Sequence, residues 1–186
     1  MTYKENDVII TSAVRTAIGT VGGFLKDTHS YDLGSKVIKE SLIRSKLKNT
    51  EVDEVVLGQV LTGGIGQNPA RQAAIKANLP INKTAYIINQ VCGSGLRSIA
   101  AGYQSILLNE SKIVIAGGQE SMTNSNNEMM LKDGLIDAYN NYHMGITAEN
   151  VAEKWNISRK DQDNFAVSSQ LKTQEAIKKR AVIGNT

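Results

Sequence analysis

Short apolar runs alternate with helical patterns along most of the chain. The runs are rich in Val and Ile, which favour strands, and they predict strands at residues 8–14, 52–61, 85–91 and 112–117. Apolar positions at helical spacing predict helices between them, at residues 31–47, 69–77 and 96–108. Strands that alternate with helices in this way form βαβ units. We therefore expect an α/β fold with a mixed, mainly parallel sheet and helices on both faces.

The helix predicted at residues 96–108 differs from the others because it is apolar on several sides. A helix of this kind is expected to be buried between two layers of the fold and not to lie on its surface. Its apolar residues are Leu96, Ile99, Ala100, Ala101, Ile106 and Leu107.

Polar signals mark the segments between and after these elements. Ser158 and Asp161 have the spacing of a capping box, which predicts a long helix from there to about Arg180. The polar segment 124–128 is expected to be a loop. The glycines at residues 63–66 predict a turn and not a phosphate-binding loop, because the Gly-Lys-Ser/Thr ending of such a loop is absent.

Composition narrows the classes of partner and compartment. The net charge is +3, from 21 basic and 18 acidic residues, so the chain is not expected to attract a nucleic acid through a strong electrostatic field. The basic cluster 178–180 is interpreted as a solvated helix end. No stretch approaches the roughly 20 apolar residues of a membrane span. A single cysteine cannot form an internal disulfide. The length predicts one domain, and a cytoplasmic location is the expectation.

That cysteine, Cys92, lies between the apolar run 85–91 and the helical pattern that follows. Only a thiolate is a good nucleophile, and free cysteine has a pKa of about 8.5. A helix N-terminus favours a nearby anion by only about 0.3 to 2 kcal/mol, so a base or a cation is also expected to act on the thiol. Gly93 and Gly95 permit a turn with positive φ, and the peptide N–H groups there are candidate donors to an oxyanion.

Other chemistry at this cysteine is less well supported by the sequence. Cysteine is among the most buried residue types and often acts as an inert hydrophobic side chain. No metal site is expected, since His29 and His143 are far apart in the chain and Cys92 has no partner cysteine. A stand-alone cysteine hydrolase is disfavoured because no motif pairs His29 with Cys92.

The residues around Cys92, Asn-Gln-Val-Cys-Gly-Ser-Gly-Leu, closely resemble the acyl-accepting segment of thiolases, the acetyl-CoA acetyltransferases. Four further blocks agree in the same order, and the resemblance extends to about Lys179. These blocks are Ser-Ala-Val-Arg-Thr-Ala-Ile-Gly at 12–19, Gly-Gln-Asn-Pro-Ala-Arg-Gln at 66–72, Gly-Gly-Gln-Glu-Ser-Met at 117–122 and Tyr-His-Met-Gly-Ile-Thr-Ala-Glu-Asn at 142–150.

The resemblance implies a function for several residues. By resemblance to thiolases, Cys92 would be acylated by an acyl-CoA. The acyl group would then pass to a second acyl-CoA in a Claisen condensation, or to CoA in thiolysis. His143, Met144 and Leu135 match segments near the pantetheine arm and the acyl pocket; His143 is not expected to be the catalytic base. No tightly bound cofactor is implied, because coenzyme A thioesters are the substrates.

The family's fold is an αβαβα sandwich of two similar halves, and this chain resembles the N-terminal half. We therefore expect residues 1–186 to form that domain, with 121–146 as a shortened remnant of the family's loop domain and the C-terminal domain absent. The Gly-His-Pro segment and the second catalytic cysteine of the family do not occur in the sequence. The chain alone is accordingly expected to be inactive.

The sequence leaves several hypotheses open about the partner of the chain and about its function. The second half could be a separate chain, as in a split enzyme, or the chain could form a homo-oligomer, with strand 85–91 pairing across a two-fold axis. A non-catalytic relict that acts as a dimerising or scaffold module is the alternative function. A β-ketoacyl synthase shares the nucleophilic cysteine but fits the blocks at 117–122 and 142–150 less well.

Overall fold

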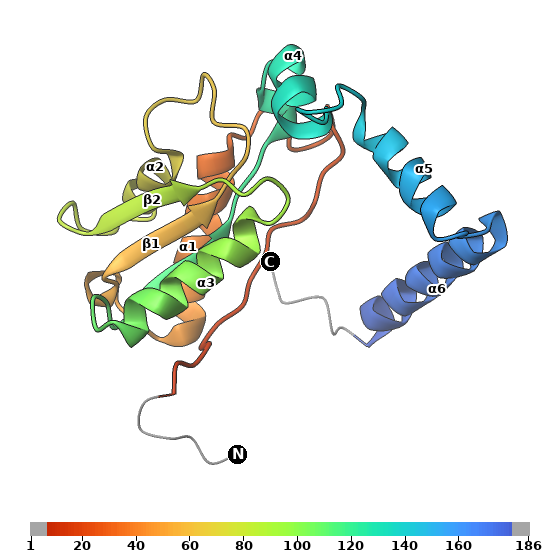
Figure 1. The fold of residues 1–186 in the computed structure, drawn as a ribbon. Helices are drawn as coiled ribbons and strands as arrows, with labels where there is room; N and C mark the ends of the chain where they lie inside the picture. Colours follow the sequence, from red (N-terminus) through yellow and green to blue (C-terminus); the bar gives the residue numbers. More distant parts are fainter. Residues whose placement is uncertain (1–6, 180–186) are drawn as a thin grey trace. The chain divides into compact units, whose positions relative to one another are not determined.

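A computed structural model describes residues 7–179 of the chain (Figure 1). The chain divides into two compact units between Gly134 and Leu135. The elements of the first unit are α1 (Ser30–Ser45), η1 (Asn49–Glu51), β1 (Glu54–Gly58), α2 (Pro69–Lys76), β2 (Thr84–Ile88), α3 (Ser94–Leu107), β3 (Val114–Gly118), η2 (Met122–Asn124), α4 (Asn127–Met129) and most of η3 (Met130–Leu135).

The three strands form one parallel sheet in the order β2-β1-β3. The central strand β1 pairs in register with both neighbours, so Val56 lies opposite Tyr86 on one side and Ala116 on the other. Helices α1 and α2 pack together on one face of the sheet, and α3 packs on the other face (Figure 1). This arrangement confirms the predicted α/β fold with a parallel sheet and helices on both faces.

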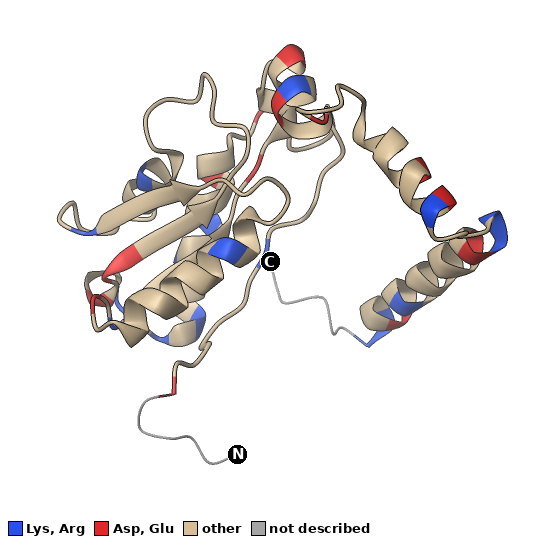
Figure 2. Ribbon diagram, in the orientation of Figure 1, with Lys and Arg blue, Asp and Glu red and all other residues tan. Residues whose placement is uncertain are grey.

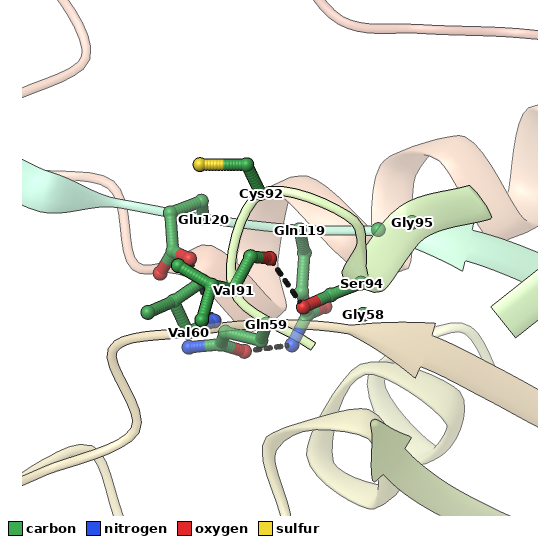
Figure 3. Close-up of a pocket in the computed structure, with 10 residues that line it drawn as sticks. Gly58, Gln59, Val60, Val91, Cys92, Ser94, Gly95, Gln119 and Glu120 are labelled. Atoms are coloured by element: carbon green, nitrogen blue, oxygen red, sulfur yellow. Dashed lines mark hydrogen bonds between the residues drawn. The ribbon is translucent and has the colours of Figure 1, made fainter. Parts of the chain in front are cut away.

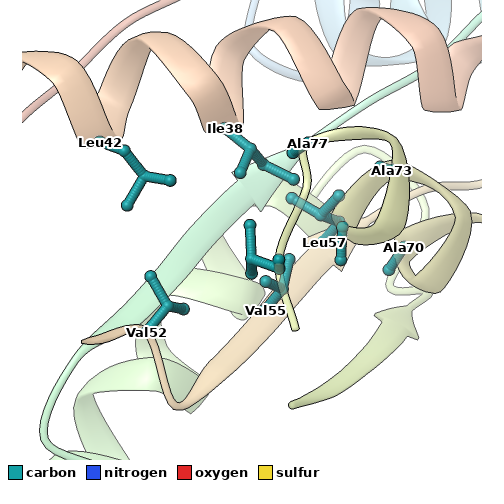
Figure 4. Close-up of a cluster of buried hydrophobic side chains, with 10 residues drawn as sticks. Ile38, Leu42, Val52, Val55, Leu57, Ala70, Ala73 and Ala77 are labelled. Atoms are coloured by element: carbon teal, nitrogen blue, oxygen red, sulfur yellow. The ribbon is translucent and has the colours of Figure 1, made fainter. Parts of the chain in front are cut away.

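The hydrophobic core lies between β1 and the pair of helices α1 and α2 (Figure 4). Val55 and Leu57 point into it, whereas Val56 points to the opposite face, because successive side chains of a strand alternate. All three are buried, as expected of a central parallel strand. Helix α2 contributes small side chains, which let α1 pack closely against it. The buried cluster comprises Ile38, Leu42, Val52, Val55, Leu57, Ala70, Ala73, Ala74, Ala77 and Leu79.

Helix α3 is not buried between two layers, as the sequence predicted for residues 96–108, because only one of its sides is covered. Its buried residues are small or polar, namely Ser94, Ser98, Gly102 and Ser105, and they face the sheet. Gly102 lets the helix lie close to β3, because an added Cβ would lie 3.0 Å from Val114 Cγ1 and the valine side chain would have to shift. The apolar side of α3 is exposed instead, with Leu96 at 75%. Arg97 is the only charged residue of the helix (Figure 2).

The strand predicted at residues 8–14 is wrong. Residues 7–20 carry no strand or helix, and none of the residues that the structure describes forms a ladder with them. Ile9 and Ile10 are exposed. An apolar, β-branched run marks a segment that suits a sheet, but a strand also requires a neighbouring strand to accept its hydrogen bonds.

Most other boundaries agree with the sequence to within a few residues. The largest shifts are three residues, at the ends of β1 and β2, where the predicted runs 52–61 and 85–91 extend beyond the paired residues. Residues 63–64 form the predicted turn. The polar segment 124–128 is not wholly a loop, because the end of η2 and the start of α4 fall within it. Asn126 begins α4 by accepting the N–H of Glu128.

The second unit contains α5 (Met144–Lys154) and α6 (Arg159–Lys178). The predicted capping box is confirmed at α6, where the Ser158 Oγ accepts the Asp161 N–H at 3.1 Å and the carboxylate accepts the Ser158 N–H at 3.2 Å. The predicted end at Arg180 lies outside the described residues. Across residues 7–179 no helix has the length and apolar character of a bilayer span.

Candidate active site

An open pocket of about 370 Å³ lies at the carboxyl ends of β1 and β3, where the loop after β2 leads into α3 (Figure 3). Ligands of parallel α/β sheets bind at this edge, because the loops that follow the strands converge there. Cys92 is exposed and lines the pocket. The other lining residues are Gly58, Gln59, Val60, Val91, Ser94, Gly95, Gly118, Gln119 and Glu120.

Cys92 is carried on a tight loop whose hydrogen bonds are made largely by Ser94. The Ser94 Oγ donates to the Val91 carbonyl at 2.6 Å and accepts the Gln90 N–H at 2.8 Å (Figure 3). The Gly93 N–H donates to the Gln90 carbonyl at 3.0 Å. Helix α3 begins at Ser94, two residues before its predicted start at Leu96, so Cys92 lies two residues before the helix.

The backbone strain of this loop falls on Val91 and not on the glycines. Val91 has φ +48°, whereas Gly93 has φ −84° and Gly95 is helical. The expectation of positive φ at Gly93 and Gly95 is therefore wrong. A β-branched residue in the left-handed region is an outlier that costs on the order of 1 to 3 kcal/mol. The surrounding hydrogen bonds must offset that cost.

Gly58, at the end of β1, is the glycine whose lack of a side chain the site requires. A Cβ at this position would lie 2.4 Å from the Ser94 carbonyl carbon and 2.6 Å from the Gly95 nitrogen, which is closer than any real contact. The start of α3 therefore rests directly on the backbone of β1. A Cβ added at Gly95 would have nothing within 4 Å, so no close contact requires glycine there. The role of the Gly93 and Gly95 N–H groups as oxyanion donors stays a prediction.

Glu120 is a site residue that the sequence alone did not single out. Its carboxylate accepts the Val60 N–H at 2.8 Å and the Leu61 N–H at 3.3 Å, which ties the segment after β1 to the segment after β3. Burial raises the pKa of Glu120 above its ordinary value, and these backbone donors oppose the rise. Its signals in the sequence are its position two residues after β3 and its place in the block at 117–122.

Two glutamines form a buried polar floor beneath the pocket (Figure 3). Gln59 Nε2 donates to Ser30 Oγ at 3.0 Å and to the Leu61 carbonyl at 2.8 Å, which fixes the orientation of its amide. Gln59 Oε1 then accepts from Gln119 Nε2 at 2.8 Å. Gln119 Oε1 has no partner and packs against Gly34, where an added Cβ would lie 1.9 Å from it. Sequence reasoning did not find this pair.

The remaining predicted site residues belong to the second unit. Leu135 ends η3 and is half-buried, and His143 and Met144 lie at the start of α5. His143 caps that helix, because its Nδ1 accepts the Gly145 N–H at 3.0 Å. A backbone bridge joins His143 to Ile136. The substrate-binding role of these three residues stays a prediction.

No three side chains among His, Cys, Asp and Glu gather into a cation site anywhere between residues 7 and 179. The pocket thus offers one thiol, one carboxylate, one hydroxyl, two side-chain amides and backbone groups as its chemical groups. The model of the thiolase N-terminal domain matches residues 8–182, which includes every element of both units. The chain belongs to the thiolase family.

Curated relatives agree with this membership. An acetyl-CoA acetyltransferase of Rhizobium meliloti is 49% identical over 92% of this chain and 48% of its own length. An acetyl-CoA acetyltransferase of Paracoccus denitrificans is 48% identical over 91% of this chain and 48% of its own length. A probable acetyl-CoA acyltransferase of Staphylococcus aureus (strain COL) is 48% identical over 91% of this chain and 47% of its own length. The chain thus spans about half the length of the thiolase relatives it matches.

Proposed function

We propose that this chain is the acyl-accepting half of an acetyl-CoA C-acyltransferase, with Cys92 as the nucleophile. The observation that carries the proposal is an exposed thiol, the only one in the sequence, in a pocket at the carboxyl edge of a parallel sheet in a thiolase domain. The names of the relatives support acyl-CoA as the substrate class. No tightly bound cofactor is needed for this step.

The step itself is a thioester exchange. The Cys92 sulfur attacks the acyl carbonyl carbon of the acyl-CoA, a new bond forms between that sulfur and the acyl group, and the bond from the carbonyl carbon to the CoA sulfur breaks. The thiol proton of Cys92 ends on the leaving CoA. The acyl group on Cys92 then awaits a second acyl-CoA or CoA, as in the two directions of the thiolase reaction. A reducing, cytoplasmic setting would keep the thiol available.

The pocket alone is poorly equipped to move that proton. Glu120 is its only titratable group besides Cys92, and its carboxylate is engaged by two backbone N–H groups. A helix N-terminus by itself activates a thiol only modestly. We therefore propose that the chain acylates slowly by itself and that condensation or thiolysis needs a base from outside these 186 residues.

The exposed side of α3 is the surface on which we propose that a second thiolase half, or a second copy of this chain, docks. Its residues Leu96, Ile99, Tyr103 and Leu107 repeat at helical spacing and are each at least 44% exposed. Contiguous apolar surface of this kind marks an interaction site. Arg97 is the only charge that would oppose burial of the helix.

The proposed function predicts exchange of CoA through the acyl enzyme. The chain is incubated with acetyl-CoA and isotopically labelled free CoA, and the label in acetyl-CoA is followed over time. Label should enter acetyl-CoA in proportion to the chain concentration, slowly, and Cys92→Ser should abolish the exchange. Exchange that persists in Cys92→Ser, or none with the wild-type chain, would contradict the proposal, and absence in both would favour the scaffold function.

A further inference from the structure

Both backbone groups of Val91 are held by side chains of its own loop. The Val91 N–H donates to the Asn89 Oδ1 at 2.9 Å. The Val91 carbonyl accepts from the Ser94 Oγ at 2.6 Å and from the Ser94 N–H at 3.1 Å. Val91 therefore has a specific partner for each polar group in the conformation that places Cys92 directly after it.

That conformation is one a valine would otherwise leave. Its φ of +48° brings Cβ too close to the backbone, and a β-branched side chain makes the crowding worse. The side chain of Val91 is half exposed, at 51%, so packing around it is incomplete. The hydrogen bonds from Asn89 and Ser94 are consequently what holds the residue there. Glycine at the same position would adopt this φ without strain.

Asn89 also connects the loop to the sheet. Its Nδ2 donates to the Val60 carbonyl at 3.4 Å, and the N–H of Val60 is in turn bound by Glu120. One side chain therefore contacts the segment after β1 with its amide nitrogen and the cysteine loop with its amide oxygen. The position of Cys92 relative to the sheet depends on both contacts.

We propose that Asn89 is a positioning residue: it keeps Val91 in the left-handed conformation and thereby sets where the Cys92 thiol is presented. The inference rests on the proposed role of Cys92 as nucleophile, but its test does not use an acyl-CoA. It measures the second-order rate of Cys92 alkylation by iodoacetamide, which reports one site because the chain has one cysteine. This rate depends on the thiolate fraction and on access to the sulfur, and the loop determines how the sulfur is presented.

Asn89→Ala should lower the alkylation rate by about 2- to 12-fold, the equilibrium factor that one ordinary hydrogen bond supplies. Val91→Gly alone relieves the strain at this position, and its rate is the reference for the double variant. The double variant Asn89→Ala/Val91→Gly should recover the rate, because glycine needs no side chain to hold its φ positive. Asn89→Ser should also recover much of it, since a serine hydroxyl accepts a hydrogen bond from the second following N–H.

Asn126→Ala is the matched control. Asn126 accepts the Glu128 N–H at 2.8 Å through the same two-residue spacing and does not line the pocket, so its loss should leave the rate unchanged. Far-ultraviolet circular dichroism confirms that each variant is folded, and Asn89→Leu, which also lacks an acceptor for the Val91 N–H, replaces the alanine variant if that one unfolds. The proposal is overturned if Asn89→Ala reacts as fast as the wild type. It is also overturned if Asn89→Ala lowers the rate and neither Asn89→Ala/Val91→Gly nor Asn89→Ser reacts faster than Asn89→Ala. A loop that behaves as expected in a chain that exchanges no CoA would refute the proposed function alone.

Discussion

The Glu120 carboxylate, which follows β3, accepts the backbone N–H of Val60, which follows β1, at 2.8 Å. This contact joins two segments that are 60 residues apart in the sequence and forms one wall of the pocket beside Cys92. The carboxylate is half-buried, and burial raises its pKa above the ordinary value of 4.5. The wall of the site is therefore sensitive to protonation.

The raised pKa of Glu120 predicts a pH-dependent stability. A carboxyl group whose pKa is higher in the folded than in the unfolded chain stabilises the fold most below the unfolded value and loses that contribution as the pH rises through the folded value. The free energy of unfolding of the wild type should thus fall relative to that of Glu120→Gln as the pH rises above about 4.5. Urea unfolding of both proteins across the acidic range measures the difference. A difference that is constant with pH would contradict the account.

Asp53 predicts the opposite sign. Its carboxylate accepts the Lys112 N–H at 2.8 Å and the Ile113 N–H at 3.1 Å, and Lys83 Nζ lies 3.6 Å away. The Lys112 N–H is the main cause that lowers the pKa of Asp53 below 3.8. The resulting stability is present above that value and is lost as the pH falls through the folded pKa. The advantage of the wild type over Asp53→Asn should shrink with acidification in the same urea experiment; growth of that advantage would contradict the prediction.

Gly58→Ala tests the close approach of α3 to β1. The added methyl group would lie 2.4 Å from backbone of Ser94, which cannot move aside as a flexible side chain can. We expect a loss of unfolding free energy of about 1 to 3 kcal/mol, the usual cost of overpacking. Gly117→Ala is the control, because it places a methyl group on β3 with nothing within 4 Å. Equal stability of the two variants in chemical unfolding would show that α3 does not rest on Gly58.

The exposed side of α3 predicts self-association of the chain alone. Tyr103 and Leu107 are each 50% exposed on that side. Replacing both by Lys should shift the sedimentation coefficient toward that of a monomer, because two charges would have to be buried in the interface. Ile81→Lys, at a residue 83% exposed outside the helix, should leave the association unchanged. A wild-type chain that sediments as a monomer at every concentration would contradict the prediction.

The sequence predicts local structure well here and tertiary contacts less well. The capping box of α6 and the helix α2 that begins at Pro69 follow from signals within a few residues, and both occur. The strand expected at 8–14 fails because its apolar pattern contains no information about a partner strand. The burial expected for α3 fails for the same reason, since an apolar helix face indicates a surface to be covered and not what covers it.

The site shows the same division. Cys92 at a loop before a helix was predicted from the residues around it, and its exposure agrees with a reactive thiol. The contact of Gln59 with Gln119 and that of Glu120 with Val60 join residues about 60 positions apart, so no local pattern contains them. The positive φ of Val91 could not be predicted, because valine is among the residues that avoid it most.

The most direct measurement is the acylation of Cys92 itself. The chain is incubated with acetyl-CoA, quenched in acid so that a thioester survives, digested and analysed by mass spectrometry, with Cys92→Ser treated in parallel. We predict one acetyl group on the peptide that contains Cys92, removed by hydroxylamine and absent from the serine variant. Acetylation only at other residues, or none after prolonged incubation with a folded chain, would contradict the assignment of Cys92 as the acyl acceptor.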